Sequence, residues 1–323
     1  MPTIGYFLSC EQYGPKELVA QARAAQDAGF ERLWISDHFH PWNDEQGESP
    51  FVWAVIGALS QVTSLPVTTA VTCPIIRIHP AIIAQAAATC AVMTRGRFRL
   101  GVGTGEALNE SILGGPWPNA DVRREMLAEA IEVMRQLWTG KVVNHRGPHY
   151  TVQHARLFTV PEEPVPVYVS AFGPASTRFA AQVGDGFLTT RPDRATIDMF
   201  KQLSSGKPVV VNSKACVAPT VDEAEKIAYQ TWPTNGLPGE LNQVLPSPAH
   251  VEQAVSLVRP EQVTATIACG PDPERHIEAM QRYRDAGADE IYVAPVGPHY
   301  REMIKLYTRE VIPALAATTG NAA

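Results

Sequence analysis

Two histidines, an aspartate and a tryptophan follow directly on an apolar run near the start of the chain. The run Leu33 to Ile35 reads as a buried strand, and it ends in Ser36-Asp37-His38-Phe39-His40-Pro41-Trp42. Because histidine changes its charge near neutral pH, His38 or His40 could accept or donate a proton, with Asp37 orienting a ring. Alternatively, the two histidines are only hydrogen-bonded within their loop and take no part in chemistry. A metal site of His38, His40 and Asp37 is disfavoured because no third histidine falls on that face.

Apolar runs rich in β-branched residues alternate with segments of helical periodicity. The expected strands are residues 4–8, 32–36, 67–71, 98–102, 167–170, 186–189, 209–217, 263–268 and 290–294. The expected helices are residues 15–29, 50–63, 80–94, 120–138, 174–184, 220–231, 247–258, 272–287 and 300–316. About eight such units within 323 residues predict one α/β domain over residues 1–323, a (β/α)8 TIM barrel with insertions.

An open doubly wound sheet is disfavoured. It would need an early Gly-x-Gly-x-x-Gly motif followed by a ribose-binding acid, whereas Gly101-Val102-Gly103-Thr104-Gly105 runs directly into Glu106. Two stretches interrupt the barrel pattern. Residues 141–152 predict an inserted β-hairpin around Arg146-Gly147-Pro148, and residues 232–248 are long and rich in Pro, Gly and Asn, which is typical of a lid or substrate wall.

Composition excludes several classes of function. A net charge of -6 without any local cluster of Lys or Arg argues against a nucleic-acid surface. No apolar run is long enough to span a membrane, and the N-terminus carries no export signal. The five cysteines are far apart and form no Cys-x-x-Cys motif, which favours a reducing, cytoplasmic location: Cys10, Cys73, Cys90, Cys216 and Cys269.

The ends of the expected strands predict where a crevice forms, since barrel enzymes build their sites there. The residues at these ends are Cys10, Glu11, Asp37 to Trp42, Thr72, Cys73, Gly103 to Asn109, Ala171 to Pro174 and Thr189 to Asp193. A histidine and a glutamate in one crevice can move protons to and from a hydroxyl, and glycines let a flat ring approach the backbone. Alternatively, Glu106 and Glu110 only cap the helix that follows.

Four motifs resemble the deazaflavin-dependent branch of the bacterial luciferase-like superfamily. They are Ser36-Asp37-His38-Phe39-His40-Pro41-Trp42, residues 79–85 (HPAIIAQ), residues 101–110 (GVGTGEALNE) and residues 183–187 (VGDGF). Within that branch the chain most resembles the F420-dependent glucose-6-phosphate dehydrogenases, over essentially its whole length. The resemblance implies a barrel enzyme that binds coenzyme F420, an 8-hydroxy-5-deazaflavin, and moves a hydride between its C5 and a carbon bearing oxygen.

The resemblance also implies roles for individual residues. It makes His38 the base on the substrate hydroxyl, Trp42 the aromatic that supports the intermediate, Glu106 the partner of the coenzyme's N1 region and Glu11 a further acid. Its coenzyme contacts are Asp37, Ala70, Val71, Cys73, Gly105, Glu106, Asn109, Ala171, Phe172 and Gly173, with a cis peptide bond between Ala70 and Val71. Its substrate contacts are Trp42, Thr190, Arg191, Asp193, Asn242, Gln243 and Thr266. It implies no metal.

One part of the chain departs from the pattern of this group. Three basic residues hold the substrate phosphate in the glucose-6-phosphate enzymes, and Asp193, Asn242 and Thr266 stand at those places here. A carboxylate and two neutral groups disfavour a dianion, so we expect a neutral substrate, either a free sugar or a secondary alcohol and its ketone. Arg191 or Arg194 could instead rebuild the anion site and restore a sugar-6-phosphate dehydrogenase.

Other interpretations keep the barrel. One is an FMN-dependent luciferase-like monooxygenase, and another is a barrel that binds flavin without turnover, which is disfavoured by His38 and Glu106 sharing one crevice. The segments at 50–63 and 80–94 are apolar on more than one face. We therefore expect a homodimer through them, unless neighbouring helices cover both faces.

Overall fold

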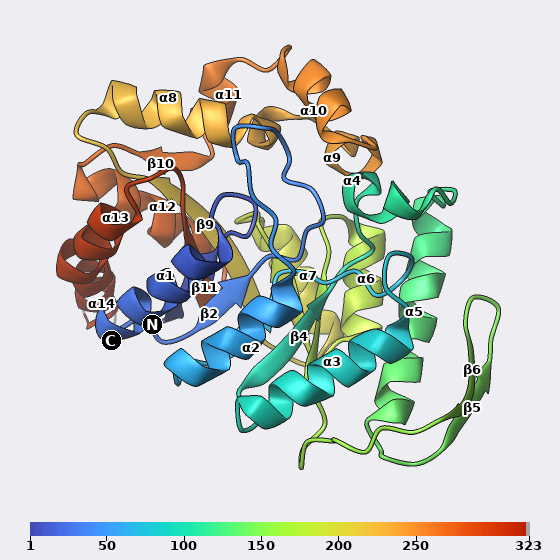
Figure 1. Cartoon of the computed structure of the whole chain (residues 1–323). Helices are drawn as coiled ribbons and strands as arrows, with labels where there is room; N and C mark the ends of the chain where they lie inside the picture. Colours follow the sequence, from blue (N-terminus) through green and yellow to red (C-terminus); the bar gives the residue numbers. More distant parts are fainter. Residues whose placement is uncertain (321–323) are drawn as a thin grey trace.

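The computed structural model describes residues 1–320 and contains a closed ring of parallel strands (Figure 1). The ring runs β9, β11, β1, β2, β3, β4, β7 and β8, and it closes where β8 pairs with β9. Its strands are β1 (Thr3–Leu8), β2 (Leu33–Ile35), β3 (Val67–Thr69), β4 (Phe98–Val102), β7 (Val167–Ser170), β8 (Gly186–Thr189), β9 (Val209–Cys216) and β11 (Glu290–Pro295). The expected (β/α)8 barrel is confirmed.

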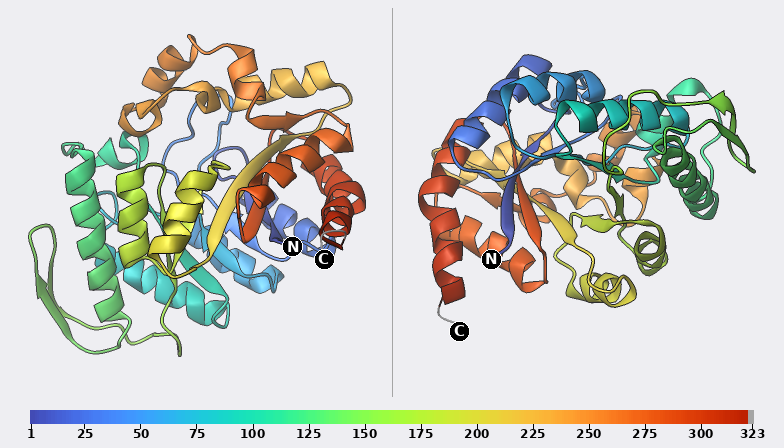
Figure 2. Two further views of the ribbon diagram at one scale, coloured as in Figure 1. Left: turned by 180° about the vertical axis from the view of Figure 1, so that it is seen from behind. Right: turned by 90° about the horizontal axis from the view of Figure 1, so that it is seen from below.

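Helices cover the outside of the ring, as the views from behind and below show (Figure 2). They are α1 (Pro15–Asp27), α2 (Val52–Val62), α3 (Pro80–Met93), α5 (Ala120–Leu137), α6 (Pro174–Val183), α7 (Arg194–Leu203), α8 (Val221–Thr231) and α12 (Pro273–Asp285). After β11 the chain continues through α13 (Tyr300–Leu306), a π-helical turn η3 (Tyr307–Val311) and α14 (Ile312–Gly320). Several helices begin with proline, whose fixed φ and missing N–H suit the first helical turn. No helix in residues 1–320 has both the length and the apolarity needed to cross a membrane.

Two expectations about these elements are wrong. No helix was expected between residues 186–189 and 209–217, where α7 lies; Asp193 caps it by accepting hydrogen bonds from the backbone N–H groups of Ala195 and Thr196. The strand expected at 263–268 is instead a short helix, α11 (Pro260–Thr264), followed by β10 (Ile267–Cys269). Among the described residues β10 pairs with β9 alone, so it lies outside the ring.

The expected hairpin is confirmed as β5 (Val143–Arg146) and β6 (Thr151–Ala155), which pair antiparallel. It projects beside α5 (Figure 1). The buried Glu129 of α5 holds it by accepting from the backbone N–H groups of His149 and Tyr150, at 3.0 and 2.9 Å, with the His145 ring 2.8 Å away.

Residues 232–248 form short helical segments rather than an open loop. They include η2 (Pro233–Gly236) and α9 (Leu241–Val244), and the chain then runs through α10 (Pro248–Val255) into α11. Figure 1 shows α9, α10 and α11 grouped with α8 on one side of the barrel. α9 contacts α4 (Ala107–Glu110), which follows the barrel strand β4 and continues into η1 (Ser111–Leu113).

One glycine lets the strands below the site approach closely. At Gly101 in β4, an added Cβ would lie 1.9 Å from the carbonyl oxygen of Thr69 in β3. The Thr69 hydroxyl donates to the Gly101 carbonyl oxygen and accepts from the Gly101 N–H. These contacts fix the end of β3, where the peptide bond between Ala70 and Val71 is cis, as the resemblance implied.

Candidate active site

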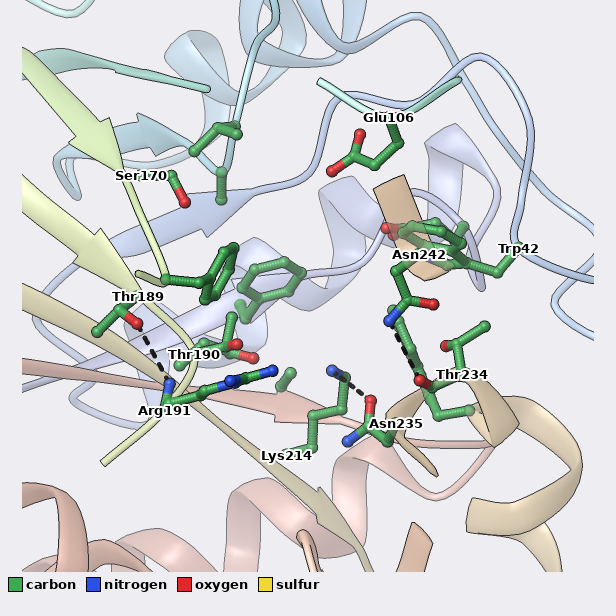
Figure 3. A pocket seen from close by; sticks show the side chains of 18 of the residues that line it. Trp42, Glu106, Ser170, Thr189, Thr190, Arg191, Lys214, Thr234, Asn235 and Asn242 are labelled. Atoms are coloured by element: carbon green, nitrogen blue, oxygen red, sulfur yellow. Dashed lines mark hydrogen bonds between the residues drawn. The ribbon is translucent and has the colours of Figure 1, made fainter. Parts of the chain in front are cut away.

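A cavity of about 260 Å³ opens where the barrel strands end (Figure 3). Residues from every part of the ring reach it, because the carboxyl ends of parallel strands meet at one face. It is lined by Phe7, Glu11, Trp34, His38, Trp42, Ala70, Val71, Glu106, Ser170, Phe172, Thr189, Thr190, Arg191, Asn212, Lys214, Trp232, Thr234, Asn235, Gly239, Asn242, Gln243 and Ala294. The four residues expected to do chemistry, His38, Glu106, Trp42 and Glu11, are all among them.

His38 follows β2, and its ring has partners on both nitrogens. Nδ1 lies 3.1 Å from the carbonyl oxygen of His40 and 3.1 Å from Nδ2 of Asn109, and Nε2 lies 3.4 Å from Oε1 of Glu11. When Nδ1–H donates to the His40 carbonyl, Nε2 is unprotonated and can accept a proton from a hydroxyl in the cavity. Once Nε2 has taken up this proton, the positively charged imidazole of His38 faces the Glu11 carboxylate, which stabilises its charge.

Glu11 is positioned by hydroxyl groups from two neighbouring strands. Its Oε2 accepts from Oγ of Ser9 at 2.9 Å and from Oγ of Ser36 at 2.6 Å, which leaves Oε1 facing His38. Strands β1 and β2 pair in parallel with Leu8 opposite Ile35, so the residues that follow them meet. The residues that follow β1 and β2 thus place the Glu11 carboxylate next to the His38 ring.

Trp42 is 8% exposed and packs edge-on against His38, with 5.2 Å between ring centroids. Its backbone N–H donates to Oε1 of Gln46, and Nε2 of Gln46 donates to the carbonyl oxygen of Thr231 at the end of α8. The loop that carries His38 is therefore tied to the helical segments on the far side of the cavity.

Three of the expected coenzyme contacts lie outside the cavity, and two of them hold this loop and its surroundings by hydrogen bonds. Asn109 accepts from the N–H groups of Phe39 and His40, at 2.9 and 3.1 Å. Asp37 accepts from Oγ1 of Thr72 at 2.8 Å, and Cys73 is buried. The side chains of Asp37, Asn109 and Cys73 are not among the described residues that line the cavities at this face.

A buried charged cluster lies beneath the same loop. Arg77 places Nη2 2.7 Å from Oδ1 of Asp37 and Nε 3.4 Å from Oε1 of Glu110, while its backbone N–H donates to the other oxygen of Glu110 at 2.8 Å. Burial raises the pKa of Glu110 to about 7, although Arg77 opposes the rise. Glu110 is thus a buried member of this cluster, and its side chain makes no hydrogen bond that caps the following helical turn.

The wall formed by Ala70 and Val71 offers space against the backbone. An added Cβ at Gly103 would lie 2.7 Å from Cγ2 of Val71, and one at Gly105 would lie 2.5 Å from Sγ of Cys73. Gly105 also has φ +73°, a conformation that favours glycine. Only glycines at these positions keep this wall open to a flat ring.

A second cavity of about 410 Å³ adjoins the first along Val71, Glu106 and Phe172. It is lined by the loop residues Ala171, Phe172 and Gly173, by Gly105 and by the start of α6. It is also lined by the guanidinium side chains of Arg123, Arg124 and Arg191. Guanidinium groups and the N–H groups of a helix N-terminus favour anions, so this cavity suits the negatively charged tail of a coenzyme.

Most residues expected to contact the substrate lie on one side of the cavity or next to it. Thr190, Arg191, Asn242 and Gln243 line it, and Thr266 lines an adjoining chamber. Asp193 is not among the residues that line these two cavities, and its exposed carboxylate caps α7 and accepts from Oγ1 of Thr196 at 2.7 Å. The repulsive carboxylate that favoured a neutral substrate is therefore not at this site.

Lys214, which the sequence analysis overlooked, lies at the centre of the substrate side (Figure 3). Its ammonium is 3.1 Å from Oδ1 of Asn235 and 4.1 Å from the centroid of the Trp232 ring. Burial lowers the pKa of Lys214 to about 8, although Glu11 opposes the drop. The available signal was the polar pair Asn212 and Lys214 at alternate positions of an apolar strand, which places both on one face.

Within residues 1–320, no three His, Cys, Asp or Glu side chains are grouped so as to hold a metal ion. The His38 ring faces Glu11 and the carbonyl oxygen of His40. The Nδ1 of His40 faces instead the carbonyl oxygen of Leu108 at 2.9 Å.

Comparison with known proteins gives matches along nearly the full chain. The model of the luciferase-like monooxygenase family matches residues 3–290. The chain is 34% identical over 326 residues to an F420-dependent glucose-6-phosphate dehydrogenase of Microbacterium testaceum (strain StLB037), covering 96% of each. It is 35% identical over 333 residues to the enzyme of the same name from Nocardia farcinica (strain IFM 10152), covering 97% of this chain and 98% of that one.

A solved structure is similarly close. It is an F420-dependent secondary alcohol dehydrogenase in complex with an F420-acetone adduct, with a TM-score of 0.90 and 33% identity over 97% of this chain and 99% of that one. The relatives therefore include both a sugar phosphate and a secondary alcohol among their named substrates.

Proposed function

From the premise that this chain belongs to the luciferase-like monooxygenase family, we propose that it is an F420-dependent oxidoreductase acting on CH–OH groups. It transfers a hydride between C5 of the deazaflavin and a hydroxyl-bearing carbon of a small molecule. The observation that carries the proposal is His38, whose Nε2 lies 3.4 Å from Glu11 on a cavity that Glu106 and the Ala70–Val71 peptide also line. The alternative, an FMN-dependent monooxygenase, predicts stronger binding of FMN than of F420.

The residues present fit the coenzyme. Ala70, Val71 and Gly103 form the wall on which a flat ring can lie, and Glu106 lies between the two cavities. Arg123 and Arg124 lie where an anionic tail would extend. When bound, F420 supplies a carbon that can accept or give a hydride, and the chain supplies alignment and proton transfer.

In the direction of alcohol oxidation, His38 accepts the hydroxyl proton at Nε2, and the O–H electron pair forms the C=O bond as the hydrogen leaves the substrate carbon with its electron pair, as a hydride to the bound coenzyme. Glu11 stabilises the charged imidazole through the contact at 3.4 Å. Trp42 packs against the ring of His38 and limits its rotation. In the reverse direction His38 returns the proton to the carbonyl oxygen.

Titration of the purified protein with oxidised F420, FMN, NAD and NADP tests the coenzyme. We expect tight binding of F420, at least about 100-fold stronger than that of FMN, followed through the visible absorbance of each ring. The variant Arg124→Met is expected to weaken F420 binding about tenfold, because it removes a charged partner of the tail. Arg156→Met is the control, since Arg156 lies on the Phe158 ring near the hairpin. Stronger binding of FMN than of F420 would contradict the proposal and favour an FMN-dependent monooxygenase.

We also propose that the chain forms a homodimer through α2 and α3. Phe51, Ile82 and Met93 are 56%, 56% and 39% exposed, and they line an apolar hollow of about 290 Å³ between these helices. An apolar patch of this kind is typical of an interface between subunits.

Ile82→Glu is expected to halve the molecular mass in solution, because it places a charge in the buried centre of that interface. Light scattering coupled to size exclusion measures the mass. The control is Leu257→Glu, a change at an 84% exposed leucine away from this hollow, which is expected to keep the wild-type mass. A monomeric wild type, or an unaffected Ile82→Glu variant, would exclude this interface.

Three coarser features complete the proposal. We propose that the described residues, 1–320, form a single domain in which the segment from 232 to 248 closes over the substrate, since Trp232, Thr234 and Asn242 line the cavity. All five cysteines have free thiols and are buried, which suits a reducing compartment such as the cytoplasm. The partner is a small-molecule substrate and neither a nucleic acid nor a membrane.

A further inference from the structure

A side chamber of about 250 Å³ lies next to the reaction cavity and shares Arg191, Lys214 and Asn242 with it. Three of its lining side chains are cationic, namely Arg191, Lys214 and Arg282. None of the described residues that line it is Asp or Glu. The chamber therefore collects positive charge without a fixed negative charge of its own.

None of the three cations forms an ion pair with a described carboxylate. Among the described residues no carboxylate oxygen lies within 4.0 Å of their nitrogens, in contrast to Arg77 and Arg99, which contact acids at 2.7 Å. In the described part of the chain, the ammonium of Lys214 contacts a neutral amide, on Asn235, and the face of Trp232. Neither of these neutralises its charge, so an anion entering the chamber gains attraction without displacing a partner.

We propose that this side chamber binds an anionic oxygen group, phosphate or carboxylate, of a substrate whose hydroxyl-bearing carbon lies beside His38. The inference rests on the proposed function and names the substrate class for the same site. Lys214 lines both spaces and so can contact the substrate between its two ends, while Arg282 lines the side chamber but not the reaction cavity. Thr266 and Asn242 provide neutral polar groups beside these cations.

The proposal replaces the expectation of a neutral substrate with one of an anionic substrate. That expectation followed from the absence of basic residues at positions 193, 242 and 266. In the structure, positive charge comes from other elements: the end of β9, the segment after β8 and helix α12. Arg191, one of the two residues considered for rebuilding an anion site, lines the chamber, whereas Arg194 does not line it and faces Asp198 on α7.

The charge on Lys214 makes anion binding depend on pH. The charged groups around it are Glu11 from the end of β1, Arg191 from the segment after β8 and Arg282 from α12. Because burial lowers the pKa of Lys214 to about 8, its ammonium is present at pH 7 and is lost as the pH rises to 9. Binding of an anion whose own charge is constant should weaken over this range.

Calorimetric titration with sulfate tests the chamber, because sulfate keeps its charge between pH 7 and 9. The protein is saturated with F420 so that the cavity lined by Arg123 and Arg124 is filled. We expect millimolar binding to the wild type at pH 7, weakened about tenfold or more by Lys214→Met and several-fold by Arg282→Met. Arg194→Met, on the exposed surface, is the control and should change the affinity less than twofold. Acetate in place of sulfate distinguishes a carboxylate site from a phosphate site.

The outcomes separate this inference from the proposed function. Equal sulfate affinity in the wild type and in both chamber variants overturns the inference, even where F420 binds tightly. Sulfate binding that is lost in Lys214→Met, in a protein that does not bind F420, supports the chamber and overturns the function. For turnover, glucose 6-phosphate and lactate represent the two anionic groups, and free glucose and 2-propanol are their neutral counterparts. The inference is also overturned if neither anionic compound is turned over and the wild type and Lys214→Met use a neutral compound with equal efficiency.

Discussion

Replacing His38 by alanine is expected to lower kcat by about 1,000-fold while leaving the Kd for F420 within several-fold of the wild type. The variant removes the group whose Nε2 accepts the hydroxyl proton, and proton transfer by a positioned side chain contributes about 10² to 10⁴ to the rate. Coenzyme affinity is retained because the ring wall and the cationic second cavity come from other elements. The rate is measured through the visible absorbance of the coenzyme, and the Kd by direct titration.

His40→Ala is the matched control, since His40 lies on the same loop and its ring faces the Leu108 carbonyl oxygen instead of the cavity. It is expected to keep kcat within several-fold. A His38→Ala variant with a near-normal rate would show that another group moves the proton, and Glu11 would be the next residue to test. Equal losses in both variants would point to disorder of the loop and would not support a base at position 38.

The barrel could be predicted from the sequence because its signal is repetitive. Each ring strand is a short apolar run, helical segments separate these runs, and the ring strands of the structure lie close to those expected. The failures are local. A proline at position 260 and the hydrogen bond from the Arg259 N–H to Gln262 begin a helix within an apolar run that resembles a strand. Apolar periodicity alone does not distinguish these cases over five residues.

The site residues that directly follow a barrel strand could be predicted from the sequence, because the end of the strand alone fixes their position. Glu11, His38 and Glu106 follow β1, β2 and β4, and the parallel ring brings the ends of these strands to one cavity. Lys214 lies within a strand, so its side chain reaches the cavity only because of the direction in which that strand position points. Asp193 lies four residues beyond β8, where the chain has already turned into a helix that uses its carboxylate as a cap.

Asp37 and Asn109 show why a motif does not by itself assign a role. Both belong to the motifs that resemble the deazaflavin enzymes, and both lie next to residues that line the cavity. In this chain their polar atoms are used by Thr72, Arg77 and the N–H groups of the loop. We therefore expect both residues to hold the loop that carries His38, with the cluster around Arg77 supporting Asp37.

Arg77→Met is expected to lower the free energy of unfolding by about 3 to 5 kcal/mol, the cost of leaving buried carboxylates without their cation. The side chain of Arg77 is 7% exposed, and those of Asp37 and Glu110 are 1% exposed. Arg135→Met is the control, because the ion pair of Arg135 with Asp185 is exposed and is expected to contribute less than about 1 kcal/mol. Urea unfolding followed by circular dichroism measures both variants.

The pH dependence of the difference in unfolding free energy between the wild type and Arg77→Met distinguishes loss of charge pairing from loss of packing. Because the pKa of Glu110 is raised in the folded state to about 7 from its ordinary value of 4.5, the folded state binds the extra proton between these values. Stability from this group is therefore present at low pH and is lost as the pH rises through that window. Without Arg77 the pKa rises further, so the loss continues above pH 7, and the variant should lie closest to the wild type at acidic pH. A deficit that is the same at pH 5 and pH 8 would mean that Arg77 stabilises the fold by packing and not by its charge.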